Sequence, residues 1–279
     1  MITLNDVSYA YPDTEHFQLL HIDLTVDRGS IVGIVGGSGA GKSTLAKIIS
    51  GFIPHVDGGT LEGTVSIDGV GLADVSLAEA VSHVGLIIQS PFNQISGAKF
   101  TVREELAFGL ENLGTPREEM AERVAAVAHL LGITGLLDRS PYELSGGQMQ
   151  LVAIASMIIM NTPVLVMDEP TSQLDPGGTR MVFDIIGGLR DAGITVVIFE
   201  HKLELIREHA DVVHVLAGNT LVASGEPRTV LADARLDDWA VGNTRYTDAA
   251  ALAARRSLTP DTDLPVSYDD AVHYFGRAR

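Results

Sequence analysis

The stretch that decides the fold reads Gly36-Gly37-Ser38-Gly39-Ala40-Gly41-Lys42-Ser43-Thr44. It follows an apolar, branched run at residues 30–35 and precedes a segment of helical pattern, so we predict a strand, a glycine-rich turn and a helix in that order. Glycines let successive backbone N–H groups turn toward one point, and the helix N-terminus adds positive potential there. The stretch therefore predicts a nest for phosphate, with Lys42 as a point charge and the Ser43 hydroxyl as a ligand for Mg²⁺.

Acidic residues follow a second apolar run, at residues 163–167, which reads as a buried strand ending in Asp168 and Glu169. Ligands of open α/β sheets lie at the carboxyl ends of strands, so both carboxylates should face the phosphate nest. We expect Asp168 to hold Mg²⁺ through its water shell and Glu169 to polarise the water that attacks a phosphate. Gln89 and His201 also follow strand-like runs, although neither residue type at a strand end predicts a function by itself.

A third motif, Leu144-Ser145-Gly146-Gly147-Gln148, lies between the nest and the acidic pair. Ser145 is expected to cap a helix, so that its hydroxyl and the amides of Gly146 and Gly147 form a second anion nest. The three motifs in this order resemble ATP-binding cassette (ABC) ATPases over about residues 2–231. The resemblance implies an α/β fold of the P-loop NTPase class: a RecA-like core, an N-terminal antiparallel β subdomain and an inserted helical subdomain.

The resemblance also implies that the chain binds and hydrolyses ATP, with Mg²⁺ as cofactor. Gln89 matches the family's Q-loop glutamine, His201 its switch histidine and Tyr11 the A-loop aromatic that stacks on adenine; Tyr9 shares a strand face with Tyr11, and either ring could instead pack in the core. The implied catalytic residues are Glu169, His201 and Gln89, and the implied metal ligands are Ser43, Gln89 and Asp168. The implied nucleotide-binding residues are Tyr11, Gly36, Gly37, Ser38, Gly39, Ala40, Gly41, Lys42, Ser43, Thr44, Ser145, Gly146, Gly147, Gln148 and Asp175.

Two anion nests in one chain point to a dimer. In the family, a signature motif, which residues 144–148 match here, closes over ATP held by the phosphate loop of the other subunit. The D-loop aspartate, here Asp175, organises the opposite site. The resemblance therefore implies a second ATPase subunit as partner, in a homodimer or a heterodimer.

Within the family, the chain is most similar to the ATPase subunits of energy-coupling factor (ECF) importers, on the matches at residues 89–94, 100–105, 108–113 and 169–176. This implies uptake of a small molecule or metal ion through a transmembrane scaffold and a substrate-binding membrane protein, with the ATPase at the cytoplasmic face of the cell membrane. Phe92 would offer an apolar anchor, and Asn93 and Gln94 would offer amides, to an entering scaffold helix, although Phe92 could equally be a core residue.

Two residues depart from the family pattern: Leu151, where the family usually has arginine, and Glu200, which precedes the switch histidine. The alternatives are an ATPase of another ABC importer or exporter and, less favoured, an ABC ATPase outside transport.

Composition agrees with these expectations. The net charge of −17 argues against nucleic acid as a partner, since a nucleic-acid groove needs clustered Lys and Arg. The absence of cysteine excludes disulfides and fits a reducing compartment. No apolar stretch is long enough to span a bilayer, so a membrane role must come through partners.

The chain divides by pattern into a nucleotide-binding domain at residues 1–235, with the helical subdomain inserted at about 90–162, and a C-terminal extension at 236–279. Thr115 is expected to cap the second helix of the insertion, with Pro116 in its first position. In the extension we expect one short helix, after Ser267.

Overall fold

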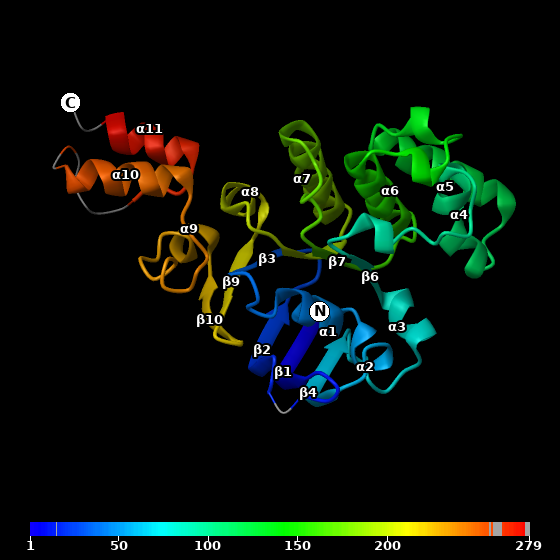
Figure 1. Ribbon diagram of the computed structural model, residues 1–279, viewed down its shortest axis with the longest axis horizontal. Coiled ribbons are helices and arrows are strands. Elements are labelled where there is room, and N and C mark those ends of the chain that lie inside the picture. The colour runs from blue at the N-terminus through cyan, green and yellow to red at the C-terminus, as the bar shows by residue number, and fades with distance from the viewer. Residues whose placement is uncertain (15, 257, 259–263, 277–279) are drawn as a thin grey trace.

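The computed structural model describes residues 1–14, 16–256, 258 and 264–276, and its strands form two sheets (Figure 1). A six-stranded sheet has the order β10-β9-β3-β8-β7-β6, and a four-stranded sheet has the order β2-β1-β4-β5. The strands are β1 Ile2–Ala10, β2 Leu19–Val26, β3 Ile31–Gly36, β4 Thr60–Ile67, β5 Val70–Gly71, β6 Val84–Ile87, β7 Val164–Asp168, β8 Thr195–Phe199, β9 Val212–Ala217 and β10 Thr220–Gly225.

The six-stranded sheet is parallel from β9 to β6, and its strands are the continuously apolar runs of the sequence. Both of its faces are covered, because alternate side chains of a strand point to opposite sides. Along β7, Val164 and Val166 enter a core with α1 and the four-stranded sheet, whereas Leu165 and Met167 enter a core with α6, α7 and α8. This architecture confirms the predicted P-loop fold with an antiparallel β subdomain.

Helices fill the connections and the chain's C-terminal part. The helices are α1 Lys42–Ile49, α2 Phe52–His55, α3 Leu77–His83, η1 Pro91–Asn93, α4 Val102–Asn112, α5 Arg117–Leu130, η2 Thr134–Leu136, η3 Pro141–Glu143, α6 Gly146–Ile158, α7 Pro176–Asp191, α8 Leu203–His209, α9 Pro227–Val230, α10 Arg245–Arg255 and α11 Tyr268–Gly276. Between β6 and β7 the chain is helical, and Figure 1 shows α4, α5 and α6 together at one side of the molecule, opposite α10 and α11.

The predicted cap of α5 is wrong. The helix begins at Arg117, Pro116 is the capping position, and no side chain caps it. The Thr115 N–H instead donates to the Leu110 carbonyl at 3.0 Å, which closes the turn that ends α4. Thr115 therefore belongs to the C-terminus of the preceding helix.

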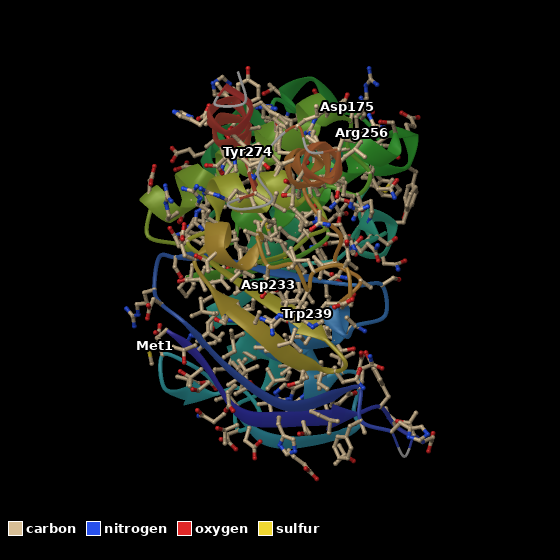
Figure 2. All side chains as sticks on the ribbon, turned by 90° about the vertical axis from the view of Figure 1, so that its left-hand side faces the viewer. Met1, Asp175, Asp233, Trp239, Arg256 and Tyr274 are labelled. Carbon is tan, nitrogen blue, oxygen red and sulfur yellow. The ribbon has the colours of Figure 1, made fainter. Side chains whose placement is uncertain are left out.

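The described part of the C-terminal extension contains two helices, α10 and α11, where the sequence pattern predicted one. Thr244 caps α10, and Ser267 accepts from the Asp270 N–H at the start of α11, as expected for the tail helix. Arg256 and Tyr274 mark these helices in Figure 2, far from Met1. Residues 257, 259–263 and 277–279 of the extension lie outside the described part.

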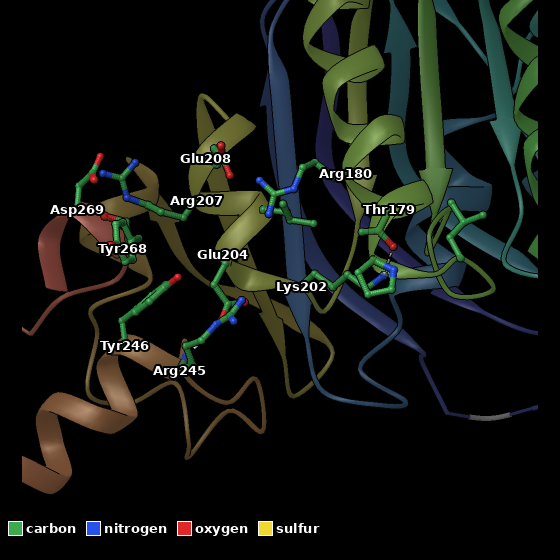
Figure 3. A pocket seen from close by; sticks show the side chains of 14 residues that line it. Thr179, Arg180, Lys202, Glu204, Arg207, Glu208, Arg245, Tyr246, Tyr268 and Asp269 are labelled. Carbon is green, nitrogen blue, oxygen red and sulfur yellow. Dashed lines mark hydrogen bonds and ion pairs between the residues drawn. The ribbon is translucent and has the colours of Figure 1, made fainter. Parts of the chain in front are cut away.

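The extension also reaches the phosphate loop. A Cβ added to Gly37 would lie 3.0 Å from the Ala240 Cβ and 3.2 Å from the Ala240 carbonyl oxygen. Farther along, a cleft of about 890 Å³ separates α7 and α8 from α10 and α11 (Figure 3). In the described ranges, no helix is both long and apolar enough to cross a bilayer.

Candidate active site

The glycine-rich loop connects β3 to α1 and depends on its glycines. Gly41 precedes the helix with φ 102°, a left-handed conformation, and a Cβ there would lie 2.8 Å from Leu19 Cδ2. A Cβ at Gly36 would lie 2.4 Å from the Leu216 carbonyl oxygen. Larger residues would displace the loop from the adjacent strands.

Lys42 lies within this loop and is only 6% exposed. Its Nζ donates to the carbonyls of Gly36 and Gly37, at 2.9 Å each. Burial lowers the pKa of its ammonium, and the nearby carboxylates of Glu169, Asp168 and Glu200 oppose that shift. A buried cation among backbone groups is suited to bind an anion such as a phosphate.

Asp168 ends β7 and fits a hard cation. Its carboxylate is buried, and no hydrogen-bond partner for Oδ1 is found in the described chain. Burial raises the pKa of this carboxyl, while a hydrogen bond from Ser43 acts in the opposite direction. The described residues contain no cluster of three or more His, Asp or Glu side chains that could hold a metal ion. That Ser43, Asp168 and Gln89 hold Mg²⁺ together with phosphate oxygens and water stays a prediction.

Glu169 is the centre of a hydrogen-bonded trio formed at the ends of three neighbouring parallel strands. Gln89 Nε2 donates to Glu169 Oε2 at 2.7 Å, and His201 Nε2 lies 3.0 Å from Glu169 Oε1. Glu169 follows β7, and Gln89 and His201 follow the flanking strands β6 and β8. Residues that lie far apart in the sequence thus meet at one carboxylate, at the sheet edge that carries the phosphate loop.

The tyrosines Tyr9 and Tyr11 have different environments. Tyr9 is fully buried and donates to the Gly58 carbonyl at 3.0 Å, so it is a core residue. Tyr11 is partly exposed, and its hydroxyl lies 3.0 Å from Thr44 Oγ1, beside the phosphate loop. Contact with adenine therefore stays a prediction for Tyr11 alone.

The signature begins α6 with a capping box. Ser145 Oγ accepts from the Gln148 N–H at 3.3 Å, and Gln148 Oε1 accepts from the Ser145 N–H at 3.1 Å. Cβ atoms added to Gly146 and Gly147 would lie 3.2–3.3 Å from Gln173. The signature of this chain therefore packs against its own D-loop, the segment from Ser172 to Asp175.

Asp175 has a local role that the sequence analysis did not assign. Its Oδ1 accepts from the Gly178 N–H at 2.7 Å, which makes Asp175 the N-cap of α7. An Asp-Pro pair before a helical run is a signal for such a cap. A role of Asp175 at the opposite subunit stays a prediction.

The segment after Gln89 corrects another expectation. Gln94 Oε1 accepts from the Ile88 N–H, and its Nε2 donates to the Leu86 carbonyl, both at 3.0 Å. One donor and one acceptor site of the amide are thus used within the chain, which ties this segment to the end of β6; contact of Asn93 and Gln94 with a scaffold helix stays a prediction. Phe92 is 62% exposed, so the interpretation of Phe92 as a core residue is wrong.

Comparisons with known proteins agree with the site described above. A family model described as ABC transporter matches residues 19–172. The chain belongs to the ABC transporter ATPase family. This ABC ATPase is 40% identical over 238 residues to the energy-coupling factor transporter ATP-binding protein EcfA of Methanothermobacter thermautotrophicus. The aligned residues cover 85% of this chain and 74% of the relative.

Solved structures agree with this assignment. The ABC ATPase resembles cbiO1 from Clostridium perfringens, part of the ABC transporter complex cbiONQ, with a TM-score of 0.73 and 27% identity over 92% of this chain and 96% of that one. It resembles equally the ATP-binding cassette MJ0796, in a dimeric post-hydrolysis state bound to ADP and Pi, with a TM-score of 0.72 and 27% identity over 81% and 99% of the two chains. The protein is thus an ATPase subunit of an ABC transporter.

Proposed function

We propose that this ATPase drives an importer of the ECF type, in which a separate membrane protein takes up a small molecule or metal ion. It would act as a homodimer or heterodimer at the cytoplasmic face of the membrane. The observation that carries the catalytic part is the trio in which Gln89 and His201 hold the two carboxylate oxygens of Glu169.

The residues have distinct tasks in hydrolysis. Lys42 and the loop amides bind the phosphates, and Glu169 accepts the proton of the attacking water. Gln89 and His201 fix the orientation of that carboxylate, since each holds one oxygen and leaves lone pairs for water. Mg²⁺ held by Ser43, Asp168 and Gln89 would neutralise charge on the phosphate oxygens.

The assignment to an importer of the ECF type is supported by the relatives named EcfA and by cbiO1. It is also supported by exposed aromatic side chains after the Q-loop glutamine, because Phe92 is 62% and Phe100 86% exposed. The exposed Tyr142 lies against the same segment, since a Cβ at Gly97 would lie 3.0 Å from its hydroxyl. Exposed aromatics of this kind are typical anchors for a partner helix.

Replacement of Phe92 and Phe100 by aspartate tests the docking surface. We expect the double variant to bind ATP normally and to lose co-purification with the membrane scaffold, because charge would be buried in an apolar contact. Val81→Asp, at a residue of α3 that is also exposed, is the matched control. Undiminished assembly of the double variant would show that the scaffold binds another surface.

The direction of transport is tested in proteoliposomes of the purified complex. With ATP and the ATPase both inside the vesicle, an importer should accumulate labelled substrate in the lumen, and Glu169→Gln should abolish the accumulation. ATP-dependent loss of preloaded substrate would instead identify an exporter. The substrate to label is the small molecule or ion that co-purifies with the membrane protein.

A further inference from the structure

We propose that Glu200 and Lys202 are positioning residues that join His201 to the D-loop through the hydroxyl of Thr171. The inference rests on the catalytic roles proposed for Glu169 and His201. It concerns two charged side chains that flank the histidine and that the hydrolysis mechanism above does not use.

Glu200 is the less expected of the two, since it is 3% exposed at the end of a buried strand. Its Oε2 accepts from the His201 N–H at 2.9 Å, and its Oε1 accepts from the Thr171 hydroxyl. A buried carboxylate is costly unless its oxygens are hydrogen-bonded, and here both are. One oxygen thus holds the backbone of the histidine, and the other holds the segment that follows Glu169.

Lys202 completes the cluster from the other side. Its Nζ donates to the Thr171 carbonyl at 3.0 Å and to Thr171 Oγ1 at 2.8 Å. It also donates to Thr179 Oγ1 at 3.0 Å (Figure 3). An ammonium has three N–H donors, and each has an acceptor here. Thr171 precedes the D-loop and Thr179 lies in the first turn of α7 after it, so a single cation holds both ends of the D-loop.

The Thr171 hydroxyl connects the two charges. It donates to Glu200 and accepts from Lys202, which orients it in one direction only. The D-loop held in this way contacts the Q-loop, where Ser172 Oγ donates to the Gln89 carbonyl at 3.4 Å, and it packs against the signature at Gly146 and Gly147. Histidine, D-loop, Q-loop and signature of one chain are therefore linked by a continuous set of contacts.

This linkage has a consequence for catalysis. His201 and Gln89 hold Glu169, so a shift of the D-loop or of the histidine backbone would move the carboxylate relative to the attacking water. A misplacement of about 1 Å can cost on the order of 100-fold in rate. Glu200 lies near Lys42, but the side chains of Thr171 and Lys202 bond to Glu200, to each other and to Thr179 rather than to the phosphate loop, so changing them should alter ATP affinity little.

The test compares Thr171→Ser with Thr171→Val in the full-length chain. Serine keeps the hydroxyl that connects the charges, whereas valine has the shape of threonine without it. We expect kcat for ATP hydrolysis to stay near the wild-type value in the serine variant and to fall at least about tenfold in the valine variant. The ATP dissociation constant, measured by calorimetry, should stay within about twofold in both.

Lys202→Met is the second variant, because it keeps the aliphatic stem and removes the ammonium. We expect a similar fall in kcat, and little further fall in the double variant with Thr171→Val, since each change by itself breaks the link through the Thr171 hydroxyl. Lys99→Met, which removes a partly buried ammonium paired with Glu111, is the control and should leave kcat unchanged.

Wild-type kcat in both Thr171→Val and Lys202→Met would overturn the inference. So would equal losses in Thr171→Ser and Thr171→Val, or losses of ATP affinity as large as the losses of kcat. These outcomes differ from failure of the proposed catalytic function, which would appear as normal hydrolysis by Glu169→Gln.

Discussion

Glu169 has a backbone conformation that is unusual for its residue type. Its φ is 47°, in the left-handed region, and its N–H donates to the Phe199 carbonyl at 2.9 Å. Such a conformation costs on the order of 1–3 kcal/mol and persists where the surroundings hold it. The side chain is held at both oxygens as well, so the carboxylate is oriented before substrate arrives.

Glu169→Gln should therefore retain ATP binding and lose hydrolysis. The amide has nearly the same shape but cannot accept a proton, and removal of a general base costs roughly 10²- to 10⁴-fold in rate. Turnover of the purified variant under saturating Mg-ATP, with affinity measured separately, checks this. An unchanged kcat would contradict the role given to Glu169.

Individual residues differed in how well the sequence predicted them. Lys42 and Ser145 were predictable because their partners are near in sequence: loop carbonyls for one and the α6 N–H groups for the other. The internal hydrogen bonds of Gln94 were not predicted, because an amide at a loop can serve the chain or a partner equally well. The cluster at Glu200 was not predictable, since Thr171 lies 29 positions away and only the fold brings the two together.

Strand β9 carries an ionisable side chain inside the sheet. His214 pairs in register with Ile34 on β3 and Ser224 on β10, and it is 7% exposed. Neither ring nitrogen has a hydrogen-bond partner within the described structure, and burial lowers the pKa of the imidazole to about 4. At pH values between about 4 and 6.5, the folded protein thus keeps this histidine neutral, whereas the unfolded chain would protonate it.

Acid should destabilise the fold through this strand. The pKa of His214 is about 6.5 in the unfolded chain and about 4 in the folded protein, so between these pH values the unfolded state binds more protons. The contribution of the neutral His214 to the free energy of unfolding is therefore fully present above pH 6.5 and is lost as the pH falls toward 4. The loss attributable to His214 is on the order of 3 kcal/mol at pH 4. Urea unfolding at pH 7 and pH 4.5 should show a smaller pH effect for His214→Leu than for the wild type; equal pH effects would contradict the assignment.

Among the helices, predictability followed the strength of the local signals. Helix α4 has a capping box at Thr101 and a buried stripe that includes Leu106 and Leu110, and both signals can be read from the sequence. Helix α10 was missed because it buries only Thr247 and Ala250, too few positions to give a helical apolar period.

At the scale of the whole molecule, the phosphate loop and the signature belong to different parts of the chain. Lys42 begins α1, beneath the parallel sheet, whereas Ser145 begins α6 in the helical part between β6 and β7. The fold was predictable at this scale because each of its motifs lies at a strand end or a helix start. The contact between Ala240 and the loop at Gly37 was not, since nothing local in the tail indicates it.

A dimer that closes on ATP should appear when hydrolysis is blocked. We expect Glu169→Gln to elute as a dimer in gel filtration with Mg-ATP and as a monomer with ADP. Adding Ser145→Arg should prevent the dimer, because the larger side chain would fill the anion nest of the signature. Ser76→Arg, at the N-cap of α3, is the matched control. If the Ser145→Arg variant still dimerised with ATP, the signature would not close on the partner's nucleotide, and a monomer of Glu169→Gln alone would point to an obligatory heterodimer.

The engagement of Lys42 with its own loop has a practical consequence, because the chain contains only four lysines. The amines of Lys47, Lys99 and Lys202 are also hydrogen-bonded, to Asp57, Glu111 and the threonines near the D-loop. The N-terminal amine is paired with Asp68 as well, so acylating reagents meet few amines, and their products can be assigned individually by mass spectrometry. Bound nucleotide should protect Lys42 from acetylation. Measuring the acetylation of Lys42 at increasing nucleotide concentrations would therefore report how much of the phosphate loop is occupied, in intact membranes and without a radiolabel or an engineered probe.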